Sequence, residues 1–330
     1  MNKPSIFLLL LTISFSLSQA EVIWDKVEEW NKNLPPSISA FYTNSSFISG
    51  RNMTAAYSII DLTDPDLEFK VVHSEGANMK TPQEYMDAET NHVYMVANGG
   101  YFNMIQNVSI SLVKSQGQVI AFDLSGKRQK FNGADIPYYV TPGAFGVYEN
   151  GTAEVVWSYS INGDFTQVWA YPEPSPNCYG CPPQLIPDSV FPKNGYAWTV
   201  PNAVGAGPVI MKNGEVHVTH EEELVYRDNQ DALNPRTGIC VTQDNKMIVI
   251  VVDGRSEASA GLLIQELGEL MQTLGCRDAL NLDGGGSTAM IVDGFVTNHP
   301  SDKTGMRHVT SAVMVLSKTK PKKTQQTITI

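Results

Sequence analysis

Residues 281–288 read Asn281-Leu282-Asp283-Gly284-Gly285-Gly286-Ser287-Thr288 and place an acidic residue and three glycines directly after an apolar segment. Three glycines in a row indicate a backbone that bends sharply or lies close to a ligand, because glycine loses the most conformational freedom on folding. Residues 280–282 are expected to form a strand, so Asp283 follows its carboxyl end. Ligands of α/β sheets bind at this edge, where successive backbone N–H groups can hold an anion. The plainer alternative is a tight turn with a capping aspartate.

The segment that precedes this stretch predicts a β-α-β unit. Residues 246–252 form a very apolar strand, and leucines at positions 263, 267, 270 and 274 predict an amphipathic helix over residues 258–274. If the strands at 246–252 and 280–282 are parallel, the right-handed crossover brings their carboxyl ends to one edge. Asp253 and Asp283 then lie at the same rim.

A hairpin adds basic residues to that rim. A tight turn at Asp244-Asn245 would pair Gln243 with Lys246 and place Arg236 opposite Asp253. Arg236 and Arg255 could then bind a phosphate in bidentate fashion. Enzymes that cleave a glycosidic bond also typically use two carboxylates. The alternative is that Arg236 and Asp253 form only an ion pair that stabilises the hairpin, with Arg255 on the surface.

The rest of the chain predicts mostly strands. They are expected at residues 56–62, 68–73, 92–97, 108–112, 118–122, 138–148, 153–158, 237–242 and 311–316, with hairpins around Asn213-Gly214 and Asp293-Gly294. Short helices are expected at residues 24–33 and after Pro82. These elements predict an α+β fold with a mixed, largely antiparallel twisted sheet, a few packed helices and one β-α-β unit near the C-terminus.

Two further motifs indicate the same site. In Asn98-Gly99-Gly100-Tyr101 a strand is followed by an amide, two glycines and an aromatic ring, a combination that suits a sugar. The bend at Gly205-Ala-Gly207-Pro suits close approach of backbone to a ligand. Residues 298–302 and Arg307-His308 are expected to fold over the same rim. Taken alone, each motif also fits an ordinary turn at the end of a strand, with its apolar side chains packed in the core.

Composition and targeting signals define the compartment. The chain has 330 residues and a formal net charge of −11, which argues against nucleic acid and anionic membranes as partners. Residues 1–20 are typical of a cleaved signal peptide, and no later apolar run is long enough to span a bilayer. We therefore expect a secreted or periplasmic protein with an N-terminal extension (21–54), a main domain (55–317) and a loosely ordered polar tail (318–330).

The cysteines and histidines predict no metal centre or other cofactor. Cys178 and Cys181 lie in a Pro-rich insertion at residues 171–200 and are expected to form a disulfide, as is usual in exported proteins. Cys240 and Cys276 are either small core residues or a second bridge. His217 and His220, with the acidic residues 221–223, would point to opposite faces of a strand and are interpreted as surface polarity.

Five of these motifs occur together in a characteristic order. They are Ala97-Asn-Gly-Gly-Tyr-Phe-Asn, Gly205-Ala-Gly-Pro-Val-Ile, Asn234-Pro-Arg-Thr, Val252-Asp-Gly-Arg and Asn281-Leu-Asp-Gly-Gly-Gly-Ser-Thr. Over residues 55–316 the chain resembles the phosphodiester glycosidase family, in its stand-alone bacterial type. The resemblance implies a hydrolase that cleaves a sugar-1-phosphodiester, such as one of N-acetylglucosamine, at the glycosidic bond. Its partner would then be a sugar phosphate or a glycan phosphodiester, such as an exopolysaccharide.

The resemblance also implies roles for individual residues. Asp283 is the first candidate for the catalytic carboxylate and Asp253 the second. The residues expected to bind substrate are Arg236, Arg255, Gly284, Gly285 and Gly286 on the phosphate side, Asn98 and Tyr101 on the sugar side, and also Gly207 and Ser287. Two other functions stay open: a non-catalytic binder of phosphorylated surface polysaccharide, and a metal-dependent phosphodiesterase with the two aspartates as ligands.

Overall fold

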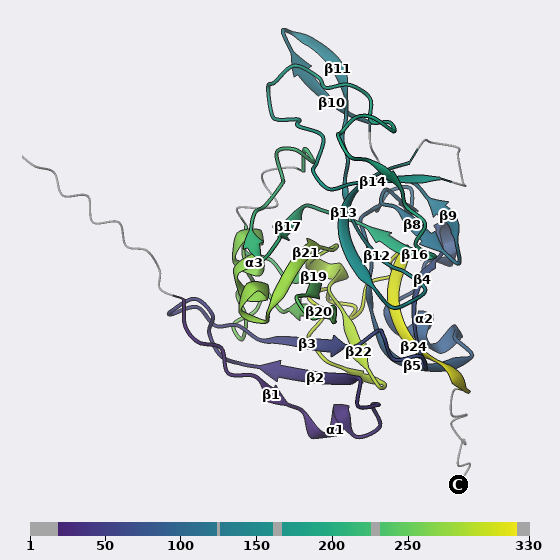
Figure 1. Cartoon of the computed structure of the whole chain (residues 1–330). Helices are drawn as coiled ribbons and strands as arrows, with labels where there is room; N and C mark the ends of the chain where they lie inside the picture. The colour runs from purple at the N-terminus through teal and green to yellow at the C-terminus, as the bar shows by residue number, and fades with distance from the viewer. Residues whose placement is uncertain (1–18, 124–125, 161–166, 226–231, 322–330) are drawn as a thin grey trace, which may run out of the picture.

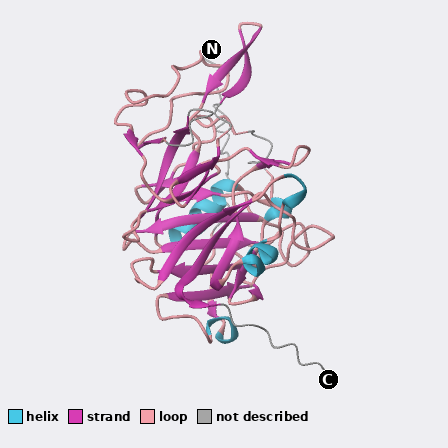
Figure 2. Cartoon of the chain, turned by 90° about the vertical axis from the view of Figure 1, so that its right-hand side faces the viewer, coloured by secondary structure: helices cyan, strands magenta, loops and turns pink. Residues whose placement is uncertain are grey.

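The computed structural model describes residues 19–123, 126–160, 167–225 and 232–321. The expected signal peptide therefore lies almost entirely outside the described residues. Strands dominate the described chain and helices are few (Figure 2). Three sheets enclose the main core, which confirms the expected α+β class with mostly antiparallel pairing. No helix among the described residues has both the length and the apolar character needed to cross a membrane.

The largest sheet has eight strands and carries the residues quoted first. In spatial order it contains β1 (Asp25–Lys26), β2 (Ile38–Thr43), β3 (Ala55–Ile60), β20 (Met247–Val252), β19 (Arg236–Thr242), β21 (Cys276–Asn281), β17 (Val209–Lys212) and β18 (Glu215–Val216). Both β20 and β21 are antiparallel to β19, which lies between them, so β20 and β21 are parallel to each other. The expected β-α-β unit is therefore present, with one strand inserted into it, and its two strands end at the same edge.

The other two sheets complete the domain. The seven-stranded sheet has the order β15 (Tyr196–Ala197), β14 (Val168–Tyr171), β13 (Ala153–Ser160), β12 (Gly143–Val147), β16 (Asn202–Gly205), β8 (Val113–Ser115) and β9 (Gln118–Ala121). The five-stranded sheet has the order β23 (Phe295–Val296), β22 (Met290–Val292), β5 (Asn91–Asn98), β24 (Ser311–Pro321) and β4 (Leu67–His73). Two pairs stand apart: β6 (Phe102–Asn103) with β7 (Val108–Ser109), and β10 (Gly126–Phe131) with β11 (Ala134–Tyr139), which projects from the body (Figure 1).

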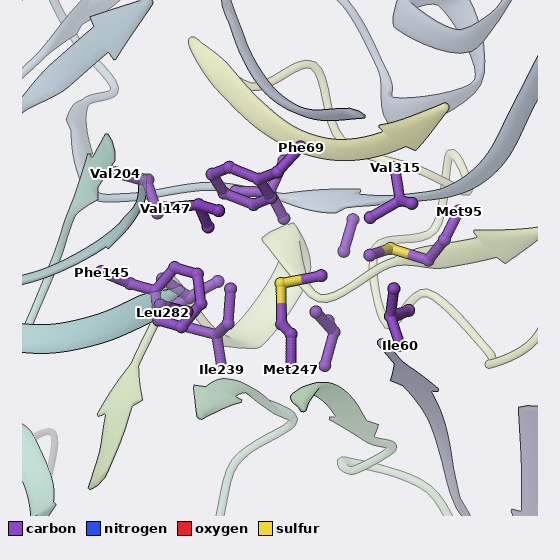
Figure 3. Close-up of a cluster of buried hydrophobic side chains, with 14 of the residues drawn as sticks. Ile60, Phe69, Met95, Phe145, Val147, Val204, Ile239, Met247, Leu282 and Val315 are labelled. Carbon is purple, nitrogen blue, oxygen red and sulfur yellow. The ribbon is translucent and has the colours of Figure 1, made fainter. Parts of the chain in front are cut away.

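The main core lies between the three sheets. Ile239 and Met247 from the eight-stranded sheet, Phe145 from the seven-stranded sheet and Met95 and Val315 from the five-stranded sheet meet there (Figure 3). All five side chains are fully buried. This burial removes apolar surface from water, at about 25 cal/mol per Å², and fixes the sheets against one another. Loops that leave different sheets therefore keep a constant position at the common rim.

Helices cover the outer faces of two sheets. The helix α3 (Ile264–Thr273) packs leucines on the far face of the eight-stranded sheet, and α2 (Pro82–Ala88) packs on the five-stranded sheet. A third helix, α1 (Glu28–Asn31), is a single turn beside β2. The helix α3 begins six residues later than expected because residues 253–262 form a loop that pairs Leu262 with Asn234. That loop forms part of the site.

Several sequence expectations need correction. Residues 138–148 are not one strand, since Pro142, which has no N–H group, separates β11 from β12. The polar tail was predicted to begin at residue 318, but β24 continues to Pro321 and pairs there with Asn91. The extension at residues 21–54 supplies β1, α1 and β2, and neither strand is among those expected from the sequence. Both expected hairpins are confirmed.

The cysteines form two disulfides. Cys178 and Cys181 are joined, as predicted, within the Pro-rich insertion between β14 and β15. Cys240 and Cys276 are also joined, and they link the adjacent strands β19 and β21. Of the two alternatives for Cys240 and Cys276, small core residues or a second disulfide, the second is therefore correct.

Candidate active site

The loops after β5 and β21 are joined where the five-stranded and eight-stranded sheets meet. The Asp283 N–H donates to the carbonyl of Gly99 at 3.1 Å, and the Asn98 side chain donates to the carbonyl of Asp283 at 2.7 Å. Both ends of this connection follow buried strands. Asp283 is consequently held by backbone contacts from two sheets.

Glycines let three further segments converge on this point. A Cβ atom built on Gly254 would lie 2.6 Å from the Pro235 nitrogen, one on Gly261 would lie 2.4 Å from the Asn234 oxygen, and one on Gly284 would lie 2.8 Å from the Pro235 oxygen. No side chain fits at these distances. The three glycines therefore allow the Asn234-Pro235 segment to pass between the loops that carry the candidate residues.

The converging loops enclose a cavity of about 380 Å³. It is lined by Tyr101, Met104, Val225, Asn234, Arg236, Arg255, Ile264, Asn281, Asp283, Gly284, Gly285, Gly286 and Arg307. Of the predicted site residues, Asp283, Tyr101, both expected arginines and the three glycines line this cavity. Asp253, Asn98, Gly207 and Ser287 do not.

Asp283 has an unusual protonation equilibrium. Burial raises the pKa of its carboxyl to about 6, and hydrogen bonds from Ser287 and the Gly284 N–H together with the charge of Arg307 oppose this rise. Desolvation disfavours the charged form and here outweighs the other effects. A carboxyl poised in this way in a cavity is typical of functional sites.

Two arginines reach the cavity from the strand β19 and from the loop after β20. Arg236 is 5% exposed and donates to the carbonyls of Leu262 and Ala232, each at 2.8 Å. Burial lowers its pKa to about 10, so the guanidinium stays charged at neutral pH. Arg255 is exposed and adopts a left-handed backbone conformation, with φ at 61°. Its Nε and Nη2 atoms donate to the side-chain oxygen of Asn234 at 3.2 and 2.9 Å.

A third arginine comes from the loop before β24. The Asp302 carboxylate accepts hydrogen bonds from Nε and Nη2 of Arg307, at 2.7 and 3.0 Å. The remaining nitrogen, Nη1, lies 3.5 Å from the Ser287 hydroxyl. Arg307 is thus oriented by one carboxylate and directed toward the loop that bears Asp283. The cavity lining contains three guanidinium groups and one carboxyl, which favours an anionic ligand.

One polar atom of a cavity-lining residue, Oδ1 of Asn281, has no partner among the described residues. The Tyr101 hydroxyl donates to the Gly207 carbonyl at 2.6 Å, and the Asn281 Nδ2 atom donates to the same hydroxyl at 2.8 Å. The Asn281 side chain is 2% exposed, and its Oδ1 atom accepts no hydrogen bond from the described residues. A buried acceptor without a donor is costly, which distinguishes Asn281 from the other residues that line the cavity.

The second predicted carboxylate lies elsewhere. Asp253 is 2% exposed, and its oxygens accept hydrogen bonds from the Thr54 hydroxyl at 2.7 Å, the His299 N–H at 2.7 Å and the Asn298 side chain at 3.3 Å. The contacts with Asn298 and His299 attach the loop after β23 to the end of β20. The expectation that Asp253 shares the cavity with Asp283 is therefore wrong.

The predicted hairpin register is also wrong by one residue. Arg236 pairs with Val252 because the turn has three residues, with Asn245 in the left-handed conformation at φ 60° and the Lys246 N–H bonded to the Thr242 hydroxyl at 2.9 Å. A one-residue shift turns a side chain to the other face of a sheet. It separates the guanidinium of Arg236 from the carboxylate of Asp253, and no ion pair joins them among the described residues.

Several predicted ligand groups act within the protein instead. Asn98 is fully buried, and its Oδ1 atom accepts from the Thr237 hydroxyl at 2.9 Å. The Gly285 N–H donates to the Pro235 carbonyl at 2.9 Å, and the Gly284 N–H bonds to the Asp283 carboxyl. A free cradle of three amides is therefore not formed.

The remaining predicted residues also have internal partners. Ser287 is fully buried and hydrogen-bonds to the Asp283 carboxyl. Gly207 contributes its carbonyl to Tyr101 and lies outside the cavity. Neither Asn281 nor Arg307 is among the site residues expected from the sequence, although residues 298–302 and Arg307-His308 are expected to fold over the rim. Strand alternation places Asn281 on the same face as Asp283, which was the available signal for it.

The sequence is similar to a known family and to several characterised and uncharacterised proteins. The family model for phosphodiester glycosidases matches residues 91–316. Mouse N-acetylglucosamine-1-phosphodiester alpha-N-acetylglucosaminidase is 24% identical over 102 residues, which cover 28% of this chain and 20% of the mouse protein. The uncharacterized protein YomE, derived from the SPbeta prophage of Bacillus subtilis, is 39% identical over 69 residues, or 21% of this chain and 11% of that protein. The matches thus span a fifth or less of these relatives.

The fold has a counterpart among solved structures. The catalytic domain of the zebrafish N-acetylglucosamine-1-phosphodiester alpha-N-acetylglucosaminidase superposes with a TM-score of 0.58 at 15% identity, covering 91% of this chain and 89% of that domain. At this identity the likeness concerns the fold. Because the family model covers more than half of the sequence, including all the arginines and the aspartate of the cavity, the chain belongs to the phosphodiester glycosidase family.

Proposed function

We propose that this protein hydrolyses the glycosidic bond of a sugar-1-phosphodiester and releases a free sugar and a phosphomonoester. The observation that carries the proposal is the position of Asp283, a carboxyl with a pKa of about 6, in one cavity with Arg236, Arg255 and Arg307. Family membership and the activity for which the mouse and zebrafish relatives are named support the same reaction class.

The arginines would act on the departing group. Cleavage of the bond between sugar C1 and the phosphate oxygen leaves its electron pair on that oxygen, so negative charge develops on the phosphate. Arg236, Arg255 and Arg307 can offset this charge with groups that are already oriented, which is the most effective form of transition-state stabilisation. A phosphomonoester is a good leaving group, so the reaction needs little help from a general acid.

Asp283 would act on the sugar. As C1 loses the phosphate it gains positive charge, and the ionised Asp283 carboxyl stabilises this oxocarbenium-like centre. The carboxyl must be deprotonated for this role, and its pKa of about 6 allows that at neutral pH. The Asn281 side chain lines the same cavity and would contribute to the polar wall beside the sugar.

Export is part of the proposal. Residues 1–20 have the pattern of a signal peptide, and two disulfides join all four cysteines of the chain. Disulfides persist mainly in oxidising compartments. We therefore place the reaction in the periplasm or outside the cell, where glycan phosphodiesters such as exopolysaccharides are substrates of the right chemistry.

The direct test uses the protein without residues 1–20 and two substrates, UDP-N-acetylglucosamine and the methyl phosphodiester of N-acetylglucosamine 1-phosphate. Release of free sugar is followed by NMR for the wild type, for Asp283→Asn and for the control Asp135→Asn, whose side chain is exposed on the β10–β11 hairpin. Release by the wild type and the control, with a loss of about 10²-fold or more in Asp283→Asn, supports the proposal. Equal turnover by Asp283→Asn would refute the role of that carboxyl.

A further inference from the structure

An exposed apolar tip lies at the opening of the cavity that contains Asp283. The tip consists of Met104 and Ile105, in the turn between β6 and β7. Met104 is 62% exposed and yet belongs to the cavity lining, so it marks the place where the cavity meets solvent. Ile105 is 94% exposed. A single exposed apolar side chain needs no explanation, but a pair of them that adjoins a ligand-sized cavity indicates a binding surface.

The backbone of the turn holds this tip away from the body of the protein. The side-chain oxygen of Asn103 accepts hydrogen bonds from the N–H groups of Ile105 and Gln106, at 2.9 and 3.0 Å, and its carbonyl accepts from the Asn107 N–H at 2.7 Å. The Asn107 carbonyl in turn accepts from the Gly76 N–H at 2.8 Å. Such a turn is fixed by its own asparagine. The tip is therefore already ordered, and a ligand that binds to it loses little free energy in ordering it.

Met104 lies beside one of the arginines that would bind the phosphate. Its Sδ atom is 3.9 Å from Nη1 of Arg307. A phosphodiester carries two alcohols, the sugar, which would face Asp283, and a second alcohol, which stays on the phosphate after cleavage. With the phosphate beside Arg307, this second alcohol would leave the cavity past Met104 and reach Ile105.

The chemistry of the tip favours an apolar alcohol at that position. The side chains of Met104 and Ile105 offer methyl, methylene and thioether groups, which form no strong hydrogen bonds. A second sugar would lose water from its hydroxyls against them without gaining partners. An alkyl chain would instead be removed from water, which is favourable, and the flexible thioether of methionine adapts to chains of different shape.

A second cavity, of about 230 Å³, suits such a chain less well. It shares Tyr101 and Val225 with the first cavity, but it also contains Asp123, Lys127 and Glu223. Glu223, which the sequence analysis interprets as surface polarity, is in fact fully buried. An alkyl chain in this cavity would exclude water from three ionisable side chains, which is costly. The opening beside Met104 carries no such cost.

We infer that Met104 and Ile105 bind the second alcohol of the phosphodiester, and that this alcohol is apolar, such as an alkyl or isoprenoid chain. The inference rests on the proposed function for the position of the phosphate. It concerns the alcohol side of the substrate, where it favours a lipid-linked sugar phosphate over a glycan phosphodiester.

The test compares equilibrium binding of methyl phosphate and octyl phosphate by calorimetry, below the concentration at which octyl phosphate forms micelles. These are the phosphomonoesters that the matching diesters would release, so no turnover is needed. The variants are Ile105→Ser and the conservative Ile105→Leu, and the control is Ile186→Ser, a 55% exposed isoleucine of the Pro-rich insertion. We expect the wild type and Ile186→Ser to bind octyl phosphate about tenfold more tightly than methyl phosphate. This ratio should fall to about threefold or less in Ile105→Ser and be largely restored in Ile105→Leu.

The results separate this inference from the proposed reaction. Equal binding of the two phosphates by the wild type, no binding of octyl phosphate at millimolar concentration, or a preference that Ile105→Ser retains in full overturns the inference, even if the wild type releases sugar from the diesters. A preference that depends on Ile105, in a wild type that releases sugar from neither the methyl nor the octyl diester of N-acetylglucosamine 1-phosphate, supports the apolar site and refutes the reaction.

Sedimentation with phosphatidylcholine vesicles tests the other use of an exposed apolar tip. Vesicle binding that Ile105→Ser abolishes, in a wild type without preference for octyl phosphate, would assign the tip to a membrane surface and overturn the inference. Circular dichroism of each variant confirms that it is folded.

Discussion

Gly286 lies against the guanidinium of Arg307 so closely that no side chain fits between them. A Cβ atom built on Gly286 would lie 2.0 Å from the Nη2 atom of Arg307 and 2.1 Å from the Oδ1 atom of Asp302. A side chain at position 286 would therefore force the ends of Arg307 and Asp302 to move. This contact links the loop before β24 to the loop that bears Asp283.

Gly286→Ala should therefore displace the pair of Arg307 and Asp302 and lower kcat/KM by roughly 10- to 100-fold, as expected when one charge-stabilising group is misplaced. The measurement is the kinetics of sugar release from the methyl phosphodiester. Gly126→Ala is the matched control, because a Cβ atom at Gly126 meets nothing within 4 Å. An activity of Gly286→Ala equal to that of the control would show that the position of Arg307 is unimportant.

Arg307→Met should shift the pH dependence of activity. The positive charge of Arg307 lowers the pKa of Asp283, against the larger effect of burial, which brings the value to about 6. Without this charge the carboxyl protonates at higher pH, so the acid limb of kcat/KM against pH should move upward from about pH 6. Arg128→Met, which removes an arginine from the exposed ion pair with Asp135, is the control. A downward shift, or none, would contradict the electrostatic account.

Asp283→Asn should change the pH dependence of stability. The ordinary pKa of an aspartate is 3.8, and in the folded protein that of Asp283 is about 6, so the folded state binds more protons between these values. The free energy of unfolding of the wild type should then fall, relative to the variant, as pH rises from about 4 to 6. At about 1.4 kcal/mol per pKa unit, the relative change is about 2–3 kcal/mol. Urea unfolding at pH 4 and pH 7 measures it, and a relative gain in stability with rising pH would give the opposite sign.

Asp253→Asn should affect stability more than chemistry. This residue accepts two hydrogen bonds from the Asn298–His299 loop and one from the Thr54 hydroxyl, and an amide nitrogen in place of one oxygen cannot accept them all. We expect the free energy of unfolding to fall by about 1–3 kcal/mol, with kcat reduced far less than in Asp283→Asn. Thermal unfolding and kinetics on the same preparation provide the test. A stable Asp253→Asn protein without activity would contradict this expectation and would indicate a catalytic role for Asp253.

The fold class and the common edge of β20 and β21 could be predicted from the sequence. The spacing of apolar residues and the glycines at turns indicate strands, helices and turns within short stretches of sequence. The sequence also placed Asp283, Arg236 and Arg255 close together. The cavity confirms that these three lie together, but their chemical roles are proposals. The separation of Asp253 from the cavity followed from a single turn residue, Asn245, whose left-handed conformation changes the hairpin register.

Other parts of the site depend on tertiary contacts that sequence periodicity does not encode. The hydrogen bond from the Gly285 N–H to the Pro235 carbonyl removes one donor from the expected anion cradle. Arg307 enters the site because Asp302 orients it, and both come from a loop without regular structure. Glu223 follows two other acidic residues and so reads as part of a solvated face. Its burial depends on donors from Gly143, Trp157 and Val209, far away in the sequence.

The central claim is that the bond between sugar carbon and phosphate oxygen breaks, with Asp283 acting on the sugar. Hydrolysis of the methyl phosphodiester of N-acetylglucosamine 1-phosphate in water enriched in ¹⁸O tests this claim most directly, with mass analysis of both products. We predict that ¹⁸O enters the sugar, that methyl phosphate carries none, and that Asp283→Asn abolishes the labelled sugar. Entry of ¹⁸O into the phosphate would show cleavage of the P–O bond and would contradict the account.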